Sequence, residues 1–350
     1  MLFLRLLADI STLHDDSANT SPKPSSQDFQ PAALTDLFFA LQLTSLGGFL
    51  IILLTVLLSD RVTKRHPIWV NFILSWIISC ISYSFMVGHS IDWEPPRELC
   101  LTQAILVYTV PSLTAGATFA LLVHVLIFFR VTFTFPEATR PRAIWYILLI
   151  FVPYVPALGM LFLSLGIGIS DPGTVKILEN GMYCNMRNEF PGKLSAIIVT
   201  VWMIACVILE VLIFKDLRRN WQAVRDEVFA HMKGTTIRIF VFSVSTIIAA
   251  CLGVIFFFED NHGPALNIII ALIPLNAMLV FGSQGDIIRS WISAFRRIGR
   301  LFCRRNSDDL SSSSGEGIIG MTSWSSQNNS TGSNLNTPHT AYPPSFYNAM

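Results

Sequence analysis

The chain has little charge, and almost none of it lies in the long apolar runs. Charged residues make up 13% of the 350 residues and hydrophobic residues 52%, whereas a soluble domain carries roughly 25% charged residues. Of the 24 basic and 23 acidic residues, only Glu210 falls inside an apolar run. This shortage of charge argues against a water-soluble protein.

Seven apolar runs are each long enough to cross a hydrocarbon core of about 30 Å, which takes about 20 helical residues. They cover residues 37–59, 68–87, 101–129, 144–170, 194–214, 239–258 and 265–284. No run has the strict alternation of a barrel strand, and lipid cannot satisfy backbone polar groups, so the runs should be α-helices. We expect an all-α integral membrane protein with an extracellular N-terminal tail (1–36), a seven-transmembrane helix bundle (37–284), an amphipathic eighth helix on the membrane surface (285–303) and a disordered cytoplasmic tail (304–350).

The chain lacks residues that two kinds of membrane protein require. A retinal-binding pump needs a Schiff-base lysine deep in its last helix, but Lys233 is the last lysine of the chain. A zinc-dependent hydrolase needs several ligands at membrane depth, where the runs offer only His124 and Glu210. We therefore expect no enzymatic activity, no cofactor and no metal.

A transporter is harder to set aside. Transporters usually contain internal repeats and broken helices with polar groups at the membrane midplane. The chain shows no repeat, and the prolines within the runs are expected to kink helices; they are Pro111, Pro153, Pro156 and Pro274. A membrane transporter or a non-signalling scaffold remains the alternative function.

The basic residues are divided unevenly between the two sides. Of the 24 Lys and Arg residues, 18 lie in the odd-numbered gaps between runs and in the C-terminal tail. The positive-inside rule therefore places the N-terminus outside and the C-terminus in the cytosol, as expected for a multi-pass protein of the plasma membrane. Asn19 begins an "NTS" sequon in the outer tail, where we expect glycosylation.

Two of the six cysteines lie on the side that should face out. Cys100 is at the mouth of the third run and Cys184 is in the fourth gap, where oxidation is permitted. The others are Cys80, Cys206 and Cys251 inside runs and Cys303 on the cytosolic side. We predict a Cys100–Cys184 disulfide, with two free thiols as the alternative because spacing does not fix connectivity.

The stretch "GDIIRSWISAFRRIGRLFC" follows the last run and has two distinct faces. Apolar residues recur at three-to-four-residue spacing on one face and arginines fill the other; these are Ile287, Ile288, Trp291, Ile292, Phe295, Ile298 and Phe302 against Arg289, Arg296, Arg297 and Arg300. The pattern predicts a helix on the inner leaflet, ending at Cys303 where palmitoylation would add an anchor. A simple basic flank of the last span is the alternative.

Together, seven runs, an outside N-terminus, the placement of Cys100 and Cys184 and a basic eighth helix resemble the G-protein-coupled receptors over about residues 37–303. The ending "PLNAMLVFGSQGDIIRSW" resembles that of the orphan receptor-like proteins of mushroom-type fungi. The resemblance implies a cell-surface receptor that binds an unknown extracellular ligand and activates a heterotrimeric G protein. The expected partners also include membrane lipids but no nucleic acid.

The chain departs from the rhodopsin-like receptors at their activation motifs. Arg130 in "HVLIFFR" lacks an adjacent acid, the sixth run has no proline, and "PLN" stands where those receptors have Asn-Pro-x-x-Tyr. We expect Glu210 to pair with Arg130 or Arg238 and to hold the inner helix ends closed, with His124 at comparable depth. The alternative is a protonated carboxyl or one that reaches a local water.

Ligand contacts are expected in the outer half of the bundle, at Gln103, Tyr108, Trp202 and Asn267. The alternative for these residues is interface anchoring or hydrogen bonding between helices. Arg218 and Arg219 begin the third inner loop, where we expect contact with the G protein. Their alternative role is to set topology and touch anionic lipid.

Overall fold

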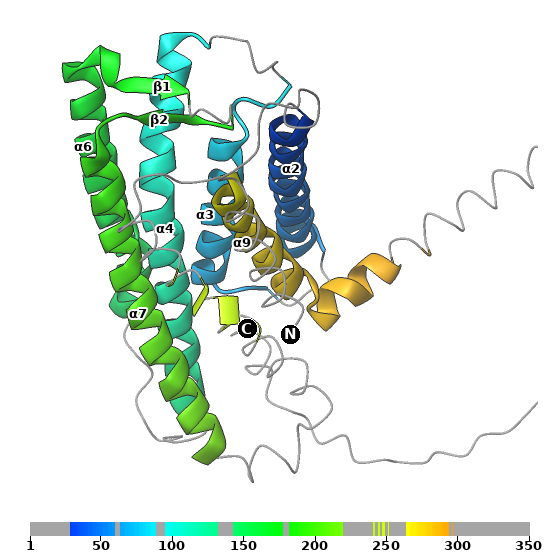
Figure 1. The fold of residues 1–350 in the computed structure, drawn as a ribbon. Helices are drawn as coiled ribbons and strands as arrows, with labels where there is room; N and C mark the ends of the chain where they lie inside the picture. Colours follow the sequence, from blue (N-terminus) through cyan, green and yellow to red (C-terminus); the bar gives the residue numbers. More distant parts are fainter. Residues whose placement is uncertain are drawn as a thin grey trace, which may run out of the picture.

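The computed structural model describes residues 29–59, 64–88, 95–131, 143–177, 182–219 and 264–293, with isolated residues at 241, 244, 245, 247, 248, 251 and 296. This part of the chain is mostly α-helical (Figure 1). The helices are α2 (Phe29–Leu58), α3 (Pro67–Tyr83), α4 (Arg97–Phe129), α5 (Ala143–Phe151), α6 (Tyr154–Ser170), α7 (Glu189–Arg219) and α9 (Pro264–Gly282). A further helix, Gly285–Ser293, follows α9 at an angle of 76°.

Four helical stretches in these residues are long and apolar enough to cross a membrane. They are Ala33–Leu58, Arg97–Phe128, Ile144–Ser170 and Glu189–Arg219, and the bent pair of α9 and Gly285–Ser293 makes a fifth. α3 has 17 residues, or about 26 Å at 1.5 Å per residue, at the lower limit for a span. The fold is therefore that of a helical protein built to lie in a membrane.

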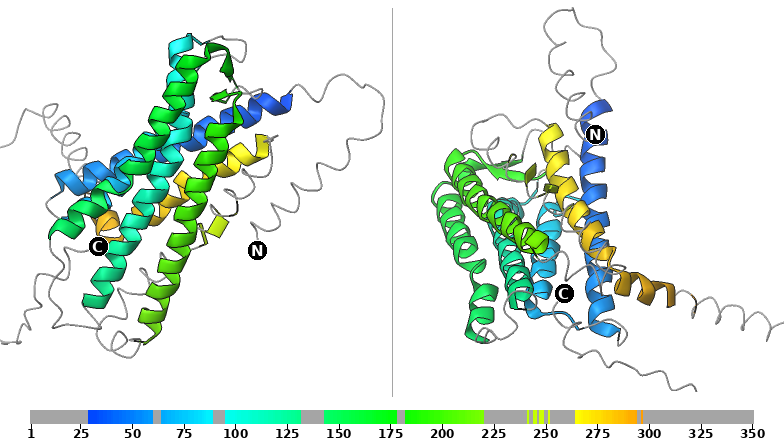
Figure 2. Two further views of the ribbon diagram at one scale, coloured as in Figure 1. Left: turned by 90° about the vertical axis from the view of Figure 1, so that its left-hand side faces the viewer. Right: turned by 90° about the horizontal axis from the view of Figure 1, so that it is seen from below.

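α4 is the central helix of the described bundle. It packs against α3, α6 and α7 and touches the two strands described below, whereas α2 packs against α3 and α9. Both views in Figure 2 place α4, α6 and α7 side by side. α4 and α7 run in the same direction, because Ser195 bonds to Tyr108 near one end and Arg130 pairs with Asp216 near the other.

The predicted fourth span, 144–170, is broken into two helices. α5 ends at Phe151 and α6 begins at Tyr154, so Pro153 interrupts the helix as expected. Gly116 of α4 allows close packing at this break, because a Cβ there would lie 3.0 Å from the Pro153 Cα. Pro111 and Pro274, by contrast, lie inside continuous helices.

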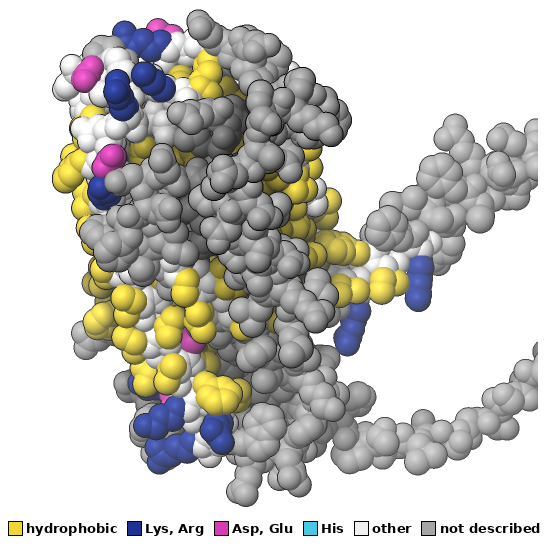
Figure 3. Space-filling view, viewed as in Figure 1, with side chains coloured by type: hydrophobic (Ala, Val, Ile, Leu, Met, Phe, Trp, Pro, Cys, Tyr) yellow, Lys and Arg dark blue, Asp and Glu magenta, His cyan; other side chains and the backbone are white. Residues whose placement is uncertain are grey.

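The outward faces of the helices are apolar. On α7 the exposed side chains Ile197, Val201, Ile204, Ile208 and Val211 recur every three or four residues, which is one face of a helix. Figure 3 shows hydrophobic side chains over the middle of this side, with Lys and Arg gathered toward its two ends. Such a belt between charged ends suits a lipid surround.

A β-hairpin, which the sequence analysis did not predict, follows α6. A 3₁₀ turn, η3 (Pro172–Thr174), leads into β1 (Val175–Ile177), which pairs antiparallel with β2 (Cys184–Met186). The signal was present in the sequence, because Asn180-Gly181 lies between the strands and Asn-Gly is a preferred hairpin turn.

Several expectations lie outside the described residues. These are the glycosylation of Asn19, the pairing of Arg238 and the palmitoylation of Cys303. The sixth run is described only at isolated helical positions. One of them, Ser245, accepts a hydrogen bond from Asn276 of α9.

Candidate functional site

The hairpin is fastened to the N-terminal end of α4, which we call the disulfide end. The structure confirms the predicted Cys100–Cys184 disulfide, which joins α4 to the start of β2 across 84 residues. The backbone N–H of Cys184 donates to Gln103 Oε1 at 3.0 Å, and that of Met186 donates to the Tyr108 hydroxyl at 3.2 Å. The Tyr108 hydroxyl also donates to Met186 O at 3.4 Å. One disulfide and three hydrogen bonds therefore fix β2 along α4.

Tyr183, the residue before the disulfide cysteine, packs against side chains of three further helices. The Tyr183 ring lies 6.2 Å from that of Phe38 on α2 and 5.7 Å, edge to face, from that of Tyr83 on α3. Its hydroxyl donates to Asn267 Oδ1 of α9 at 2.9 Å. A single hairpin side chain thus contacts α2, α3 and α9.

Burial governs the chemistry of this cluster. Met182 is 0% exposed and Tyr183 is 8% exposed. Burial, and to a smaller extent the nearby Tyr83 and Tyr108, raises the pKa of Tyr183 above its ordinary value. The Tyr183 hydroxyl therefore stays protonated and acts as a hydrogen-bond donor.

Three of the four predicted ligand residues meet at the hairpin. Gln103 and Tyr108 bond to its backbone, and Asn267 bonds to its tyrosine. Trp202 lies deeper, between α7 and α4, with its ring 4.9 Å from that of Phe119. Trp202 therefore belongs to the α4–α7 contact, seven residues beyond Ser195 and so about 10 Å further along α7.

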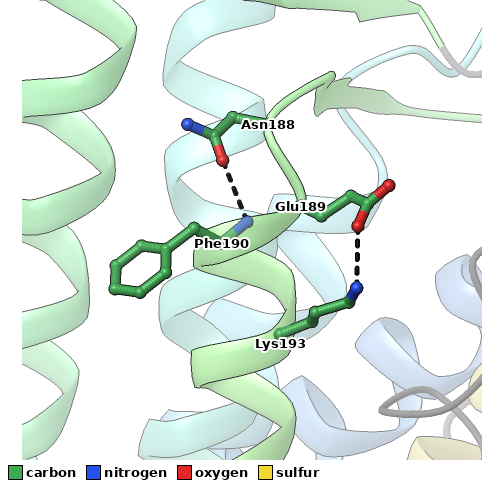
Figure 4. Close-up of polar contacts among 4 residues, drawn as sticks. All are labelled: Asn188, Glu189, Phe190 and Lys193. Carbon is green, nitrogen blue, oxygen red and sulfur yellow. Dashed lines mark hydrogen bonds and ion pairs between the residues drawn. The ribbon is translucent and has the colours of Figure 1, made fainter.

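The start of α7 is fixed by its own side chains (Figure 4). Asn188 Oδ1 accepts the backbone N–H of Phe190 at 3.0 Å, as an N-cap residue does. Lys193 Nζ lies 2.7 Å from Glu189 Oε2, one turn away on the exposed surface. Ser195 Oγ then donates to Tyr108 O at 2.8 Å, and it is this bond that ties the start of α7 to α4.

The opposite end of α4 carries exposed arginine, and we call it the basic end. Arg130 Nε lies 2.9 Å from Asp216 Oδ2 of α7. The acid that Arg130 contacts is therefore Asp216 and not Glu210, which lies six residues earlier and about 9 Å deeper along α7. Arg218 and Arg219, predicted to touch the G protein, are exposed in the last turn of α7.

Glu210 is buried on the face of α7 that packs toward α4, together with Cys206, Ile213 and Leu217. The α4–α7 register of Arg130 and Asp216 places it level with His124. The His124 ring stacks on that of His66 at 4.2 Å, between α4 and the start of α3. The proposed pairing of Glu210 with Arg238 stays a prediction.

The helix after α9 is held against α2 and against Arg65, which lies just before α3. Arg65 pairs with Asp286 at 2.5 Å, and the Trp291 indole donates to Thr55 Oγ1 at 2.8 Å. Ile287 is fully buried, whereas Ile288 and Ile292 are exposed. Residues 285–293 are therefore helical, as predicted, and make polar contacts with the bundle. The placement of this helix on the membrane surface and its extension to residue 303 stay predictions.

Sequence reasoning missed Phe38, Tyr83, Tyr183 and Asp216. The three aromatic residues come from separate segments, and no spacing rule brings them together. Asp216 has a weak signal in the sequence, because it is a lone acid among the basic residues that follow the fifth run. Its partner depends on the α4–α7 register, which the sequence alone does not state.

Comparison with known protein families and with curated proteins gave no match to either. The arrangement of the two ends of α4 is therefore the basis on which a function is assigned.

Proposed function

We propose that this protein is a seven-helix receptor of the plasma membrane that binds an extracellular ligand at its disulfide end and activates a heterotrimeric G protein at its basic end. In this proposal the N-terminus is outside, the C-terminus is cytosolic, and the run 239–258 supplies the remaining span. The proposal rests on the sequence resemblance and on one observation, the paired contacts between α4 and α7.

That observation links the two ends of the bundle. α4 and α7 contact each other through Tyr108 and Ser195 near the hairpin and through Arg130 and Asp216 near the basic end. Twenty-two residues separate Tyr108 from Arg130, or about 33 Å of helix. A ligand that moves the hairpin could thus shift two packed helices whose far ends carry the G-protein surface, which is the two-site coupling that a receptor needs.

The basic end has the charge that such a surface requires. Lys215, Arg218 and Arg219 are exposed on the last turns of α7, and α7 continues five residues past the predicted end of its apolar run. The Arg218 guanidinium lies 5.7 Å from the Phe214 ring, which orients it on the helix. A helical, cationic extension of this kind suits an acidic partner surface.

The test is nucleotide exchange on purified G proteins. The full-length protein in lipid nanodiscs should accelerate GTPγS binding by at least one heterotrimer, and Arg218→Ala/Arg219→Ala should reduce that rate severalfold. Arg187→Ala/Lys193→Ala, at the disulfide end, is the matched control and should leave ligand-independent exchange unchanged. No acceleration with any heterotrimer class, together with tracer uptake by the same protein in proteoliposomes, would replace the receptor with the transporter.

A further inference from the structure

The hairpin places Tyr183 where a bound aromatic ligand would lie. Its ring contacts Phe38 and Tyr83, and its hydroxyl donates to Asn267, so three helices surround a side chain that none of them supplies. β1 and β2 have three residues each, and so short a hairpin has little stability of its own.

Asn267 shows that the site has more hydrogen-bonding capacity than Tyr183 uses. Its side chain is 0% exposed, and its Oδ1 accepts the Tyr183 hydroxyl. Its Nδ2 is buried and has no hydrogen-bond partner in the part of the chain that the structure describes. A buried donor without a partner is uncommon and calls for an explanation.

The geometry of the Asn267 side-chain amide indicates which kind of ligand would pair with its Nδ2. A carboxamide presents one acceptor and one donor side by side. An aromatic hydroxyl with an acceptor oxygen on the neighbouring ring carbon would meet both groups, whereas the single hydroxyl of tyrosine meets only Oδ1.

We propose that Tyr183 is an internal occupant of a phenol-binding site formed by Phe38, Tyr83 and Asn267, and that small phenols bind there by displacing it. This deepens the proposed function by naming a ligand class for the disulfide end. The tethered tyrosine competes at an effective concentration on the order of millimolar. Phenols therefore bind the wild-type protein weakly, and a variant without the Tyr183 ring binds them more tightly.

The experiment uses the full-length protein in nanodiscs and three probes that share an ethyl-substituted ring: 4-ethylphenol, 4-ethyl-2-methoxyphenol and ethylbenzene. Binding is measured by saturation-transfer NMR, and release of the hairpin by hydrogen exchange of the 182–187 backbone amides. In the wild type, 4-ethylphenol should speed exchange of these amides, 4-ethyl-2-methoxyphenol should do so at a lower concentration, and ethylbenzene should not.

Variants distinguish a phenol-binding site from ordinary packing of a hydrophobic core. Tyr183→Ala should bind 4-ethylphenol at least tenfold more tightly than wild type, and Asn267→Leu should abolish the preference for phenols over ethylbenzene. Tyr183→Phe keeps the ring but loses the hydroxyl, so it should be displaced at severalfold lower 4-ethylphenol concentration. Tyr154→Phe, which loses a hydrogen bond to Asn71 elsewhere in the bundle, is the matched control and should behave as wild type.

Unchanged exchange of residues 182–187 in wild type and in Tyr183→Phe at saturating phenol would overturn the proposal. So would equal affinity of Tyr183→Ala for ethylbenzene and 4-ethylphenol, since that would mark a simple cavity. Neither readout involves a G protein. If the protein binds phenols but activates no G protein, the phenol site stands and the receptor function is wrong. If it activates a G protein but does not bind phenols at this site, the receptor function stands and the phenol site is wrong.

Discussion

At the scale of single residues, the Arg130–Asp216 pair is the contact most directly placed to restrain the basic end. Both side chains are partly exposed, at 46% and 22%, so the pair contributes at most about 1 kcal/mol. That is little for the stability of the whole bundle, but a bias of about 1 kcal/mol shifts a two-state equilibrium about fivefold.

We expect Arg130→Gln and Asp216→Asn each to raise ligand-independent GTPγS exchange severalfold while the thermal unfolding midpoint stays close to wild type. The double variant should show no further increase, because each single change already breaks the same pair. Additive effects of the two changes, or unchanged basal exchange in both single variants, would contradict a restraining role.

His66 provides a second prediction at this scale, in the pH dependence of stability. Burial lowers its pKa below the ordinary value of about 6.5. Its contribution to stability is therefore complete above about pH 6.5 and is lost as the pH falls toward the folded-state pKa, because the unfolded chain then binds more protons. The thermal unfolding midpoint should therefore be lower at pH 5.5 than at pH 7.5.

His66→Asn tests this contribution. The His66 side chain accepts the Ile68 backbone N–H as the N-cap of α3, and asparagine retains that capping role without titrating. The variant should lose part of the acid-induced drop in the midpoint. Equal drops in wild type and variant would show that His66 does not contribute.

At the scale of the elements, the close packing of α4 on the α5–α6 break depends on Gly116. A Cβ there would meet the Pro153 backbone at 3.0 Å and its Cβ at 3.1 Å, and backbone cannot yield as a flexible side chain does. Gly116→Ala should destabilise the protein by about 1–3 kcal/mol, read as a lower unfolding midpoint in detergent. Gly47→Ala on α2, with nothing within 4 Å, is the control and should be neutral or stabilising.

The disulfide acts at the same scale, by holding the hairpin on α4. It closes a loop across 84 residues, for which chain entropy sets an upper value of about 4–5 kcal/mol. Cys100→Ser/Cys184→Ser should lower the unfolding midpoint and speed hydrogen exchange of residues 182–187. Cys251→Ser, which removes an exposed free thiol, should change neither.

At the scale of the whole molecule, six of the seven apolar runs correspond to described helices, one of them broken at Pro153. The thickness of the hydrocarbon core fixes how long such a run must be, which is why the runs could be recognised. Their ends were less predictable. α7 begins at Glu189 and ends at Arg219, since polar residues at the interface continue a helix that the apolar run only identifies in part.

Contacts between elements were predicted only in part. Gln103, Tyr108 and Asn267 were expected from depth and polarity, and the structure brings them to the hairpin. Trp202 had the same signals but lies between α4 and α7. Depth along a helix follows from residue counting, whereas the direction that a side chain faces depends on how neighbouring helices rotate, which these runs do not encode.

The central claim is a seven-span bundle with its disulfide end outside, and an odd number of spans places the two termini on opposite sides of the membrane. The most direct measurement is antibody labelling of intact and permeabilised cells that express the protein with one epitope tag before Met1 and another after Met350. We predict that the N-terminal tag is labelled on intact cells and the C-terminal tag only after permeabilisation. Labelling of both tags, or of neither, on intact cells would mean an even number of spans and would contradict the receptor.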